Sequence, residues 1–468
     1  MKIRIQCRIN QWSTMRRLGA PLVALALATT LGLLQQVHGQ TAGSKGWVTS
    51  WATSTQDPLP AGFALGNPPS NSPQWAQMFP GNQASNQTFR MVVRPQAAGE
   101  QVRLRFSNLF GNRPVTFDKL TIAQRTAGKT IDGASRKTIS FAGADNVTLA
   151  PGQDVYSDPI NFAVMPEKDV AVTFHLVGDS GPITWHAKAM TTSYMSAPGV
   201  GDKTEDVNGA DLPFSLRSWV WLTELQSYKA SSPDRKSIVA IGDSITDGSG
   251  TTIDGNDRWV DFLNRRLRTA GSENVVVNEG IGGNRVTTLR WGSVIYGALA
   301  TPAVMWDFSG SPNTPDARCD GCGEPAIARL ERDALSLPNV SAIILYEGVN
   351  DIGSGGSYGE IIAGMQDIAL RAHARGVKVY GATITPYYGF AYDQVYPDIT
   401  RKRVNEWIKS SKVFDAVFDF DAVVRDPTYL ARIKPDLEAP DHIHLNPKGY
   451  QEVAQSVPLW LLDPKLPK

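Results

Sequence analysis

The sequence contains very little cysteine, and this scarcity limits the sites that it can build. Three of its 468 residues are cysteines: Cys7 near the N-terminus, and Cys319 and Cys322, which form one CxxC pair. A single pair cannot supply the four ligands of a structural zinc site. A redox-active pair is an alternative, but a thioredoxin-like context is missing around it. Because such pairs usually oxidise outside the cytoplasm, we expect a Cys319–Cys322 disulfide in the long connection over residues 301–325.

The sequence also lacks an excess of charge, an internal repeat and a low-complexity segment. Its 46 lysines and arginines nearly balance its 45 aspartates and glutamates. Neither a nucleic acid nor an anionic membrane surface is therefore implied as a partner. His175 and His186 have no carboxylate or cysteine at metal-ligand spacing, and we interpret them as structural residues. The length exceeds what one ordinary hydrophobic core organises, so we expect two domains.

The long apolar run of this sequence lies at its N-terminus. Leu18–Leu34 is almost wholly apolar or small, and it follows a segment with several basic and no acidic residues. This pattern predicts a signal peptide over residues 1–39, cut after Gly39, and hence a secreted or periplasmic protein. A retained membrane anchor is the alternative. Gly19, Pro21 and the short apolar core argue against it, so we expect no stable membrane span after signal removal.

Residues 46–228 have the pattern of an all-β domain. Val102–Phe106 alternates strictly between apolar and charged residues, as a half-buried strand does. Turn-forming residues separate similar segments, and no long segment shows helical periodicity, which predicts an antiparallel sandwich or jelly roll. Several tryptophans could fill its core or form a face on which sugars stack, and the core is the commoner role: Trp47, Trp51, Trp75 and Trp185.

Residues 235–465 have the alternating pattern of an α/β domain, which predicts a doubly wound parallel sheet with helices on both faces. Strands are expected at residues 237–241, 275–277, 342–346, 377–381 and 416–420. Helices are expected at residues 259–270, 326–337, 361–375, 401–410 and 449–462. The polar linker at 230–236 reaches about 25 Å at most, so the β domain must lie close. We expect it to dock beside the carboxyl edge of the sheet and to present a large substrate; a solubilising or folding role is the alternative.

Polar blocks follow the predicted strands at several points of the α/β domain. They are Gly242-Asp243-Ser244, the glycine-rich segment at 278–284, Gly348–Asp351, and Asp441–His444 before the last helix. In a parallel sheet the first three blocks lie along the same carboxyl edge. Each block alone resembles an ordinary turn, and Ser244 alone could be a helix cap. Their joint occurrence in this order indicates a reactive site.

The residue types of these blocks suit nucleophilic catalysis. Ser244 needs a base, and that base needs an orienting acceptor. Asp441 and His444 are three residues apart, so one turn can aim both the same way, whereas the other histidine of that block would point elsewhere. The tetrahedral oxyanion needs preorganised donors, which the N–H groups of Ser244 and Gly283 and the side-chain amide of Asn350 can supply.

Together the four blocks resemble those of the SGNH (GDSL) hydrolase superfamily, over roughly residues 237–462. The resemblance implies a flavodoxin-like three-layer α/β/α fold and carboxylic-ester hydrolysis without a metal or cofactor. It assigns Ser244 as the nucleophile, His444 and Asp441 as base and orienting acid, and Gly283 and Asn350 as oxyanion donors. Ile245 stands where the most common form of the family's serine motif has leucine. The Gly-x-Ser-x-Gly elbow of α/β-hydrolases is absent, with a threonine at its last position.

The expected function is that of a secreted serine esterase on a small-molecule or polysaccharide ester. Export and the aromatic-bearing β domain favour an O-acyl group, such as acetyl, on a carbohydrate. A lipase or arylesterase acting on lipid or aryl esters is the alternative within this class. A glycan-binding protein with a vestigial site is a rival, as is a glycoside-cleaving enzyme. Glycoside cleavage would need two flanking carboxylates, and the only candidates are Asp441, Asp243 and Asp351.

Overall fold

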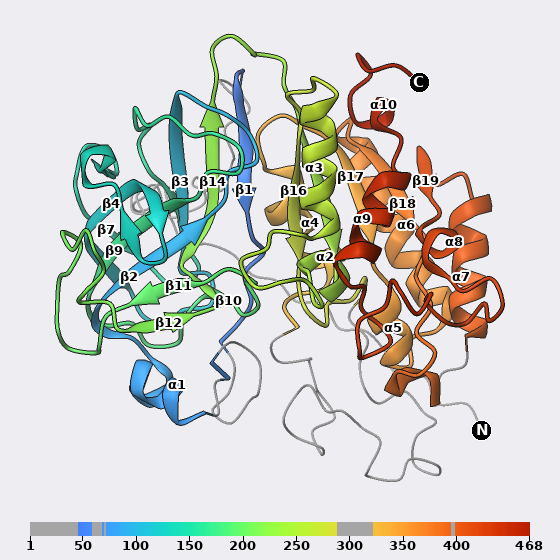
Figure 1. Cartoon of the computed structure of the whole chain (residues 1–468), viewed down its shortest axis with the longest axis horizontal. Coiled ribbons are helices and arrows are strands. Elements are labelled where there is room, and N and C mark those ends of the chain that lie inside the picture. Colours follow the sequence, from blue (N-terminus) through green and yellow to red (C-terminus); the bar gives the residue numbers. More distant parts are fainter. Residues whose placement is uncertain (1–44, 59–67, 70–71, 288–321, 395–397) are drawn as a thin grey trace, which may run out of the picture. The chain divides into compact units, whose positions relative to one another are not determined.

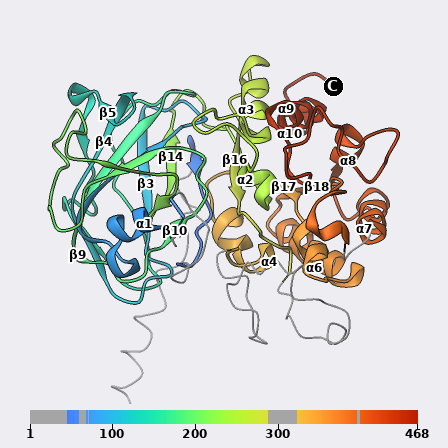
Figure 2. The same cartoon turned by 60° about the horizontal axis from the view of Figure 1, so that its bottom comes forward.

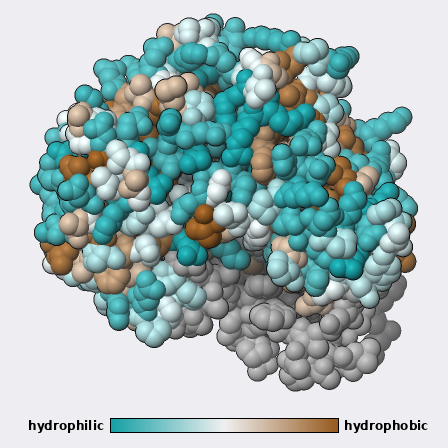
Figure 3. All heavy atoms as spheres, in the orientation of Figure 1, coloured by the Kyte–Doolittle hydropathy of each residue, from teal (hydrophilic) through white to brown (hydrophobic). Residues whose placement is uncertain are grey.

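The computed structural model describes residues 45–58, 68–69, 72–287, 322–394 and 398–468. The predicted signal peptide, Cys319 and most of the connection over residues 301–325 therefore lie outside the described residues. Within the described ranges, no helix is long and apolar enough to cross a membrane. On the face shown in Figure 3, hydrophilic residues predominate and exposed apolar residues are scattered.

The N-terminal half is rich in antiparallel strands (Figure 1). One four-stranded sheet has the order β1 (Trp47–Ala52), β14 (Leu222–Tyr228), β3 (Gln101–Ser107) and β8 (Asp154–Tyr156). An eight-stranded sheet contains β12 (Phe214–Leu216), β11 (Ser193–Met195), β2 (Ser85–Val93), β9 (Val170–Asp179), β4 (Val115–Ala127) and β5 (Thr130–Ile131), with β6 (Lys137–Thr138) and β7 (Val147–Leu149) on β4. β10 (Trp185–His186) pairs with β13 (Trp219–Val220), and short helical turns complete the region: α1 (Pro73–Met78), η1 (Pro80–Asn82) and η2 (Gly133–Ser135). We call residues 47–228 the β-rich region.

The β-rich region is held together by an aromatic core that both sheets share. Phe174 on β9 lies in ring contact with Phe106 on β3 and Phe117 on β4, with centroid distances of 5.3 and 5.1 Å. Such edge-on pairs add specificity to the burial of large apolar surfaces. The tryptophans considered as a sugar face are at most 8% exposed, which favours their interpretation as core residues: Trp47, Trp51, Trp75 and Trp185.

The C-terminal half contains a five-stranded sheet in which every neighbouring pair is parallel (Figure 2). Its order is β16 (Val275–Gly280), β15 (Ser237–Gly242), β17 (Val340–Tyr346), β18 (Lys378–Ala382) and β19 (Ala416–Phe418). The connecting helices are α2 (Ser244–Asp247), α3 (Trp259–Thr269), α4 (Ala326–Leu330), η3 (Glu331–Leu335), α5 (Val349–Gly353), α6 (Tyr358–Ala374), η4 (Ala391–Gln394), α7 (Ile399–Ser410), α8 (Phe420–Val424), α9 (Pro447–Ser456) and α10 (Leu459–Leu462). All six residues of β15 are buried, as expected of a central parallel strand. We call residues 237–462 the α/β region.

Three predicted elements of the α/β region differ clearly from the structure. The helix expected over 326–337 is α4 followed by the π-helical turn η3, which ends at Leu335. The helix expected over 449–462 is interrupted: α9 ends at Ser456 and α10 begins at Leu459, because Pro458 has no N–H for a continuous helix. The strand expected over 416–420 ends at Phe418. Asp419 then caps α8, and its carboxylate accepts a hydrogen bond from Ala422 N–H at 3.2 Å.

The two regions pack directly against each other, and residues 41–468 form one compact unit. β1 lies beside β16, the edge strand of the parallel sheet (Figure 1). Val48 on β1 and Val275 on β16 bury each other, and Thr49 N–H donates to Ser237 Oγ at 3.2 Å. An uncovered edge strand would expose unpaired backbone groups. The β-rich region therefore shields one edge of the sheet that carries the site.

Candidate active site

Ser244 lies at the sharp connection between β15 and the short helix α2. Asp243 caps this helix, with its Oδ1 accepting from Ile245 N–H at 2.9 Å. Gly242 is required just before it, since a Cβ there would lie 2.2 Å from Thr246 Oγ1. These local contacts place the Ser244 hydroxyl at the carboxyl end of β15, an inner strand of the sheet, where α/β sheets display reactive groups.

His444 and Asp441 meet Ser244 in a continuous hydrogen-bonded chain. His444 Nε2 lies 2.7 Å from Ser244 Oγ, and His444 Nδ1 lies 2.6 Å from Asp441 Oδ2. The other Asp441 oxygen accepts from the N–H of His444 at 3.1 Å. Partial burial would raise the pKa of Asp441, but the hydrogen bonds and charge of His444 hold that pKa well below its usual value. Asp441 is therefore an ionised acceptor that orients the imidazole.

The other histidine of this block has a different partner, although the turn is not the helix-like one on which the spacing argument depended. His442 Nδ1 lies 3.1 Å from Glu438 Oε2. Its backbone is left-handed, with a φ of 66°. This turn reverses the side-chain direction between neighbouring residues, so that His444 alone of the two contacts Ser244.

The predicted oxyanion donors lie in the same pocket as Ser244 and His444. Gly283 has a φ of 79°, a conformation that glycine adopts without strain. The N–H groups of Gly283 and Ser244 donate to no described residue. Asn350 Nδ2 donates one hydrogen to Asn284 O at 2.9 Å, which leaves its second amide hydrogen for another acceptor. Three donors without a second partner among the described residues therefore come from residues that line one pocket.

Tyr392 is a site residue that the sequence patterns did not indicate. Its O–H donates to Asn350 Oδ1 at 3.0 Å and thereby fixes which way the Asn350 amide points. Tyr392 also lines the pocket with two apolar neighbours, Phe390 and Ile443. It lies in a connection between β18 and α7 with no motif of its own, so no local sequence signal could have identified it.

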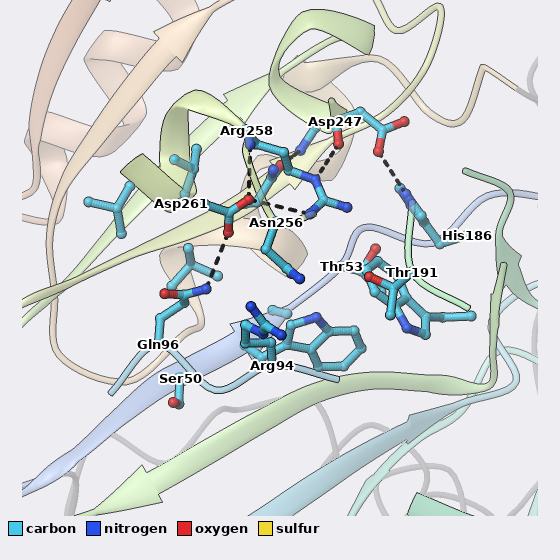
Figure 4. Close-up of a pocket in the computed structure, with 18 residues that line it drawn as sticks. Ser50, Thr53, Arg94, Gln96, His186, Thr191, Asp247, Asn256, Arg258 and Asp261 are labelled. Atoms are coloured by element: carbon cyan, nitrogen blue, oxygen red, sulfur yellow. Dashed lines mark hydrogen bonds and ion pairs between the residues drawn. The ribbon is translucent and has the colours of Figure 1, made fainter. Parts of the chain in front are cut away.

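Asp247 is a second site residue for which the sequence patterns predicted no role, although it lies three residues after Ser244. Its Oδ2 accepts from Gly282 N–H at 3.0 Å, and its Oδ1 lies 3.0 Å from His186 Nε2. His186 Nδ1 in turn donates to Ser54 O at 2.9 Å. Figure 4 shows His186 and Asp247 facing each other across the junction of the two regions. The glycine loop of the site is thus tied to the β-rich region through Asp247.

Buried charged side chains support the strand ends beneath the site. Arg329 is fully buried; it donates to Gly242 O at 3.1 Å and lies 3.8 Å from Glu347. Neither carboxylate oxygen of Glu347 has a hydrogen-bond partner among the described residues. Burial, together with the neighbouring carboxylates of Asp351 and Asp247, raises the pKa of Asp243 to about 7. Buried acidic groups whose ionisation is unfavourable therefore lie beneath the site.

The remaining predicted residues are placed only in part. Cys322 lines the pocket and is disulfide-bonded. Its predicted partner Cys319 lies outside the described residues, so the Cys319–Cys322 pairing stays a prediction. His175 is not among the residues that line the pocket. Its Nδ1 lies 2.6 Å from Asp118 Oδ1. No group of three or more possible metal ligands occurs among the residues that the structure describes.

Residues 240–452 match the model of the GDSL-like Lipase/Acylhydrolase family. No curated protein matches the chain.

Several solved structures are similar to the chain. A GDSL-like lipase from Bacteroides thetaiotaomicron VPI-5482 is 15% identical and covers 49% of this chain and 89% of its own, with a TM-score of 0.33. TesA is 19% identical, over 49% of this chain and 100% of its own, with a TM-score of 0.33. The esterase EstA from Pseudoalteromonas sp. is 16% identical, over 47% of this chain and 93% of its own, with a TM-score of 0.31.

Proposed function

Because residues 240–452 belong to the GDSL-like lipase/acylhydrolase family of the SGNH hydrolase superfamily, we propose that the protein is a serine esterase with Ser244, His444 and Asp441 as its triad. Family membership supports a hydrolase that acts on esters. The observation that carries the triad is the hydrogen-bonded chain from Ser244 Oγ through both ring nitrogens of His444 to Asp441.

The reaction follows from this geometry. His444 Nε2 accepts the proton of Ser244 while Oγ attacks the ester carbonyl carbon, and Asp441 stabilises the imidazolium that forms. The carbonyl oxygen becomes an oxyanion that the N–H groups of Ser244 and Gly283 and the Asn350 amide stabilise. His444 returns the proton to the leaving alcohol. A water molecule then attacks the acyl-serine by the same route, which releases the acid and restores the Ser244 hydroxyl.

The substrate that we propose is a small acyl group, such as acetyl, on a polar alcohol, such as a carbohydrate. Phe390, Tyr392 and Ile443 supply an apolar wall suited to the acyl group. The β-rich region contributes Lys188 to the same pocket, which favours a polar alcohol part. We also propose export, with a signal peptide over residues 1–39. Since the tryptophans of the β-rich region are buried, the carbohydrate assignment does not rest on a stacking face.

The finer architecture is part of the same proposal: a flavodoxin-like three-layer domain at 235–465, preceded by a β-sandwich domain at 46–228. The helix contacts of the α/β region support it, because α3 packs with α9 whereas α6 packs with α4 and α7. Two separate helix groups are expected when a parallel sheet is covered on both faces.

The test is hydrolysis of p-nitrophenyl acetate by the full chain and by Ser244→Ala. We expect the variant to lose nearly all turnover, because the members of a triad act as one unit. Ser249→Ala, five residues away on the same loop and without a side-chain role in the site, is the matched control and should keep turnover. A reactive phosphonate ester should label Ser244 in the wild type. Wild-type turnover by Ser244→Ala would disprove the nucleophile.

Acetate release from acetylated polysaccharides, compared with p-nitrophenyl esters of increasing chain length, separates a carbohydrate esterase from a lipase or arylesterase.

A further inference from the structure

Lys188 lies in a segment of the β-rich region that the α/β region holds on both sides. Two residues before it, His186 Nε2 lies 3.0 Å from Asp247 Oδ1. One residue after it, the carbonyl of Ala189 accepts a hydrogen bond from the Arg258 guanidinium. Ala189 is fully buried and His186 is 2% exposed. Because its neighbours are fixed in this way, the backbone of Lys188 has a defined position relative to the site.

The Lys188 side chain reaches the pocket of Ser244, where it is one of the lining residues. Its approach to the glycine loop is close: a Cβ on Gly282 would lie 3.5 Å from Lys188 Cδ and 3.7 Å from Lys188 Nζ. Gly282 immediately precedes the proposed oxyanion donor Gly283. The ammonium group is therefore beside the reaction centre, although it comes from the other region of the molecule.

The carboxylates around the site have partners other than Lys188 in the described part of the chain. The Asp247 carboxylate is occupied by His186 and by Gly282 N–H. The Asp441 carboxylate is occupied by His444. Lys188 itself forms no ion pair or hydrogen bond with a described residue. A half-buried cation in a substrate pocket without a counter-ion attracts an anionic group of the ligand.

We propose that Lys188 binds a carboxylate on the alcohol part of the substrate. The enzyme therefore prefers esters whose alcohol part carries a carboxylate, such as esters of acidic sugars. This inference rests on the proposed function, because it assumes that Ser244 cleaves an ester in this pocket. The alcohol part is favoured over the acyl part because the apolar wall of Phe390, Tyr392 and Ile443 suits the acyl group. In this arrangement the β-rich region selects the substrate and the α/β region cleaves it.

The test compares two acetylated sugars that differ in one group. One is an O-acetylated methyl glucuronoside, which carries a carboxylate, and the other is the O-acetylated methyl glucoside, which carries a hydroxymethyl group in its place. Acetate release gives kcat/KM for each, and the ratio of the two values is the readout. We expect the wild-type ratio to favour the glucuronoside, and Lys188→Met to lower this ratio by about tenfold, mainly through KM, since one charged hydrogen bond is lost. Lys188→Arg should restore most of the ratio.

Lys168→Met is the matched control, since Lys168 is exposed on the same region and the substitution removes the same charge. It should leave the ratio at the wild-type value. A second measurement uses the wild type alone: raising the salt concentration should lower the ratio, because the interaction is between two charges. An unchanged ratio in Lys188→Met, whether both rates fall together or neither falls, would overturn the proposal, as would a salt-independent wild-type ratio. If the wild type failed to hydrolyse p-nitrophenyl acetate as well, the proposed function itself would be wrong.

Discussion

The β-rich region and the α/β region each contain a histidine whose Nδ1 lies 2.6 Å from an aspartate carboxylate, His175 in the first and His444 in the second. The two differ at the other ring nitrogen. His175 Nε2 lies 3.0 Å from Asn86 Oδ1, whereas His444 Nε2 lies 2.7 Å from Ser244 Oγ. An amide oxygen has no proton to lose, but a hydroxyl has. A histidine–aspartate pair thus orients an imidazole in either region, and the third partner decides whether chemistry follows.

Both regions bury charged groups, such as Arg105 and Glu224 in the β-rich region. The core of the β-rich region also contains aromatic rings that pack edge to face among its aliphatic residues. The α/β region buries charged groups such as Arg329 and Glu347 at the strand ends beneath the site. Buried charges are costly unless they are paired, and proteins concentrate such costs near functional sites.

The largest effect is expected from removing the two histidines in turn. His444→Ala should lower kcat on p-nitrophenyl acetate by about 10³- to 10⁵-fold, because Ser244 loses its base. His175→Ala should lower stability only, with kcat unchanged, because its partners are Asp118 and Asn86. Steady-state kinetics and thermal melts of both variants are the measurement. Comparable losses of kcat in the two variants would refute the assignment of chemistry to one region.

A smaller loss is expected at the oxyanion position. Asn350→Ala should lower kcat by about 100- to 1,000-fold with a lesser change in KM, since its amide acts mainly in the transition state. Tyr392→Phe keeps the ring and removes only the hydroxyl that orients Asn350, so its kcat should fall by about tenfold or less. A larger loss in Tyr392→Phe than in Asn350→Ala would contradict this order of roles.

Removing the His186–Asp247 contact between the two regions should have a moderate effect on both the stability of the protein and its kcat. His186→Ala removes a buried partner of Asp247, which should cost about 3 kcal/mol in the free energy of unfolding. Because Asp247 also accepts from Gly282 N–H, kcat should fall by about tenfold as the glycine loop loosens. Urea unfolding and kinetics on the same preparations provide the check. If stability fell with no change in kcat, the junction would be structural only.

The smallest effect concerns the buried acidic groups. An unfolded aspartate titrates near 4, whereas burial raises the pKa of Asp243 to about 7 in the folded protein. The folded state therefore keeps a proton that the unfolded state loses, and the free energy of unfolding should fall as pH rises from about 4 to about 7. Asp243→Asn keeps an acceptor for Ile245 N–H and should reduce this fall by about 1 to 3 kcal/mol.

Urea unfolding at pH about 5 and about 8 measures the pH effect. Asp145→Asn, at an exposed position of the β-rich region, is the control and should leave the pH dependence unchanged. An Asp243→Asn variant with the same pH dependence of stability as the wild type would show that Asp243 is ionised in the folded protein.

The amino-acid sequence alone identified the residues that follow the strands. Ser244, Gly283 and Asn350 each lie in a short polar block after a parallel strand, and His444 lies in a similar block before α9. The strand and helix alternation likewise predicted the parallel sheet, since the apolar periodicity of each element is local. Where local patterns were insufficient, as at Pro458 and Asp419, the predicted element ran past a residue that ends or caps a helix.

The tertiary structure alone decided what surrounds these residues. Tyr392 orients Asn350 from 42 positions away, and His186 meets Asp247 from 61 positions away, in the other region. Lys188 reaches the pocket from the β-rich region without any motif. Such contacts depend on how two regions pack against one sheet edge, and packing is a property of surfaces far apart in the chain. No periodicity or spacing within one segment encodes it.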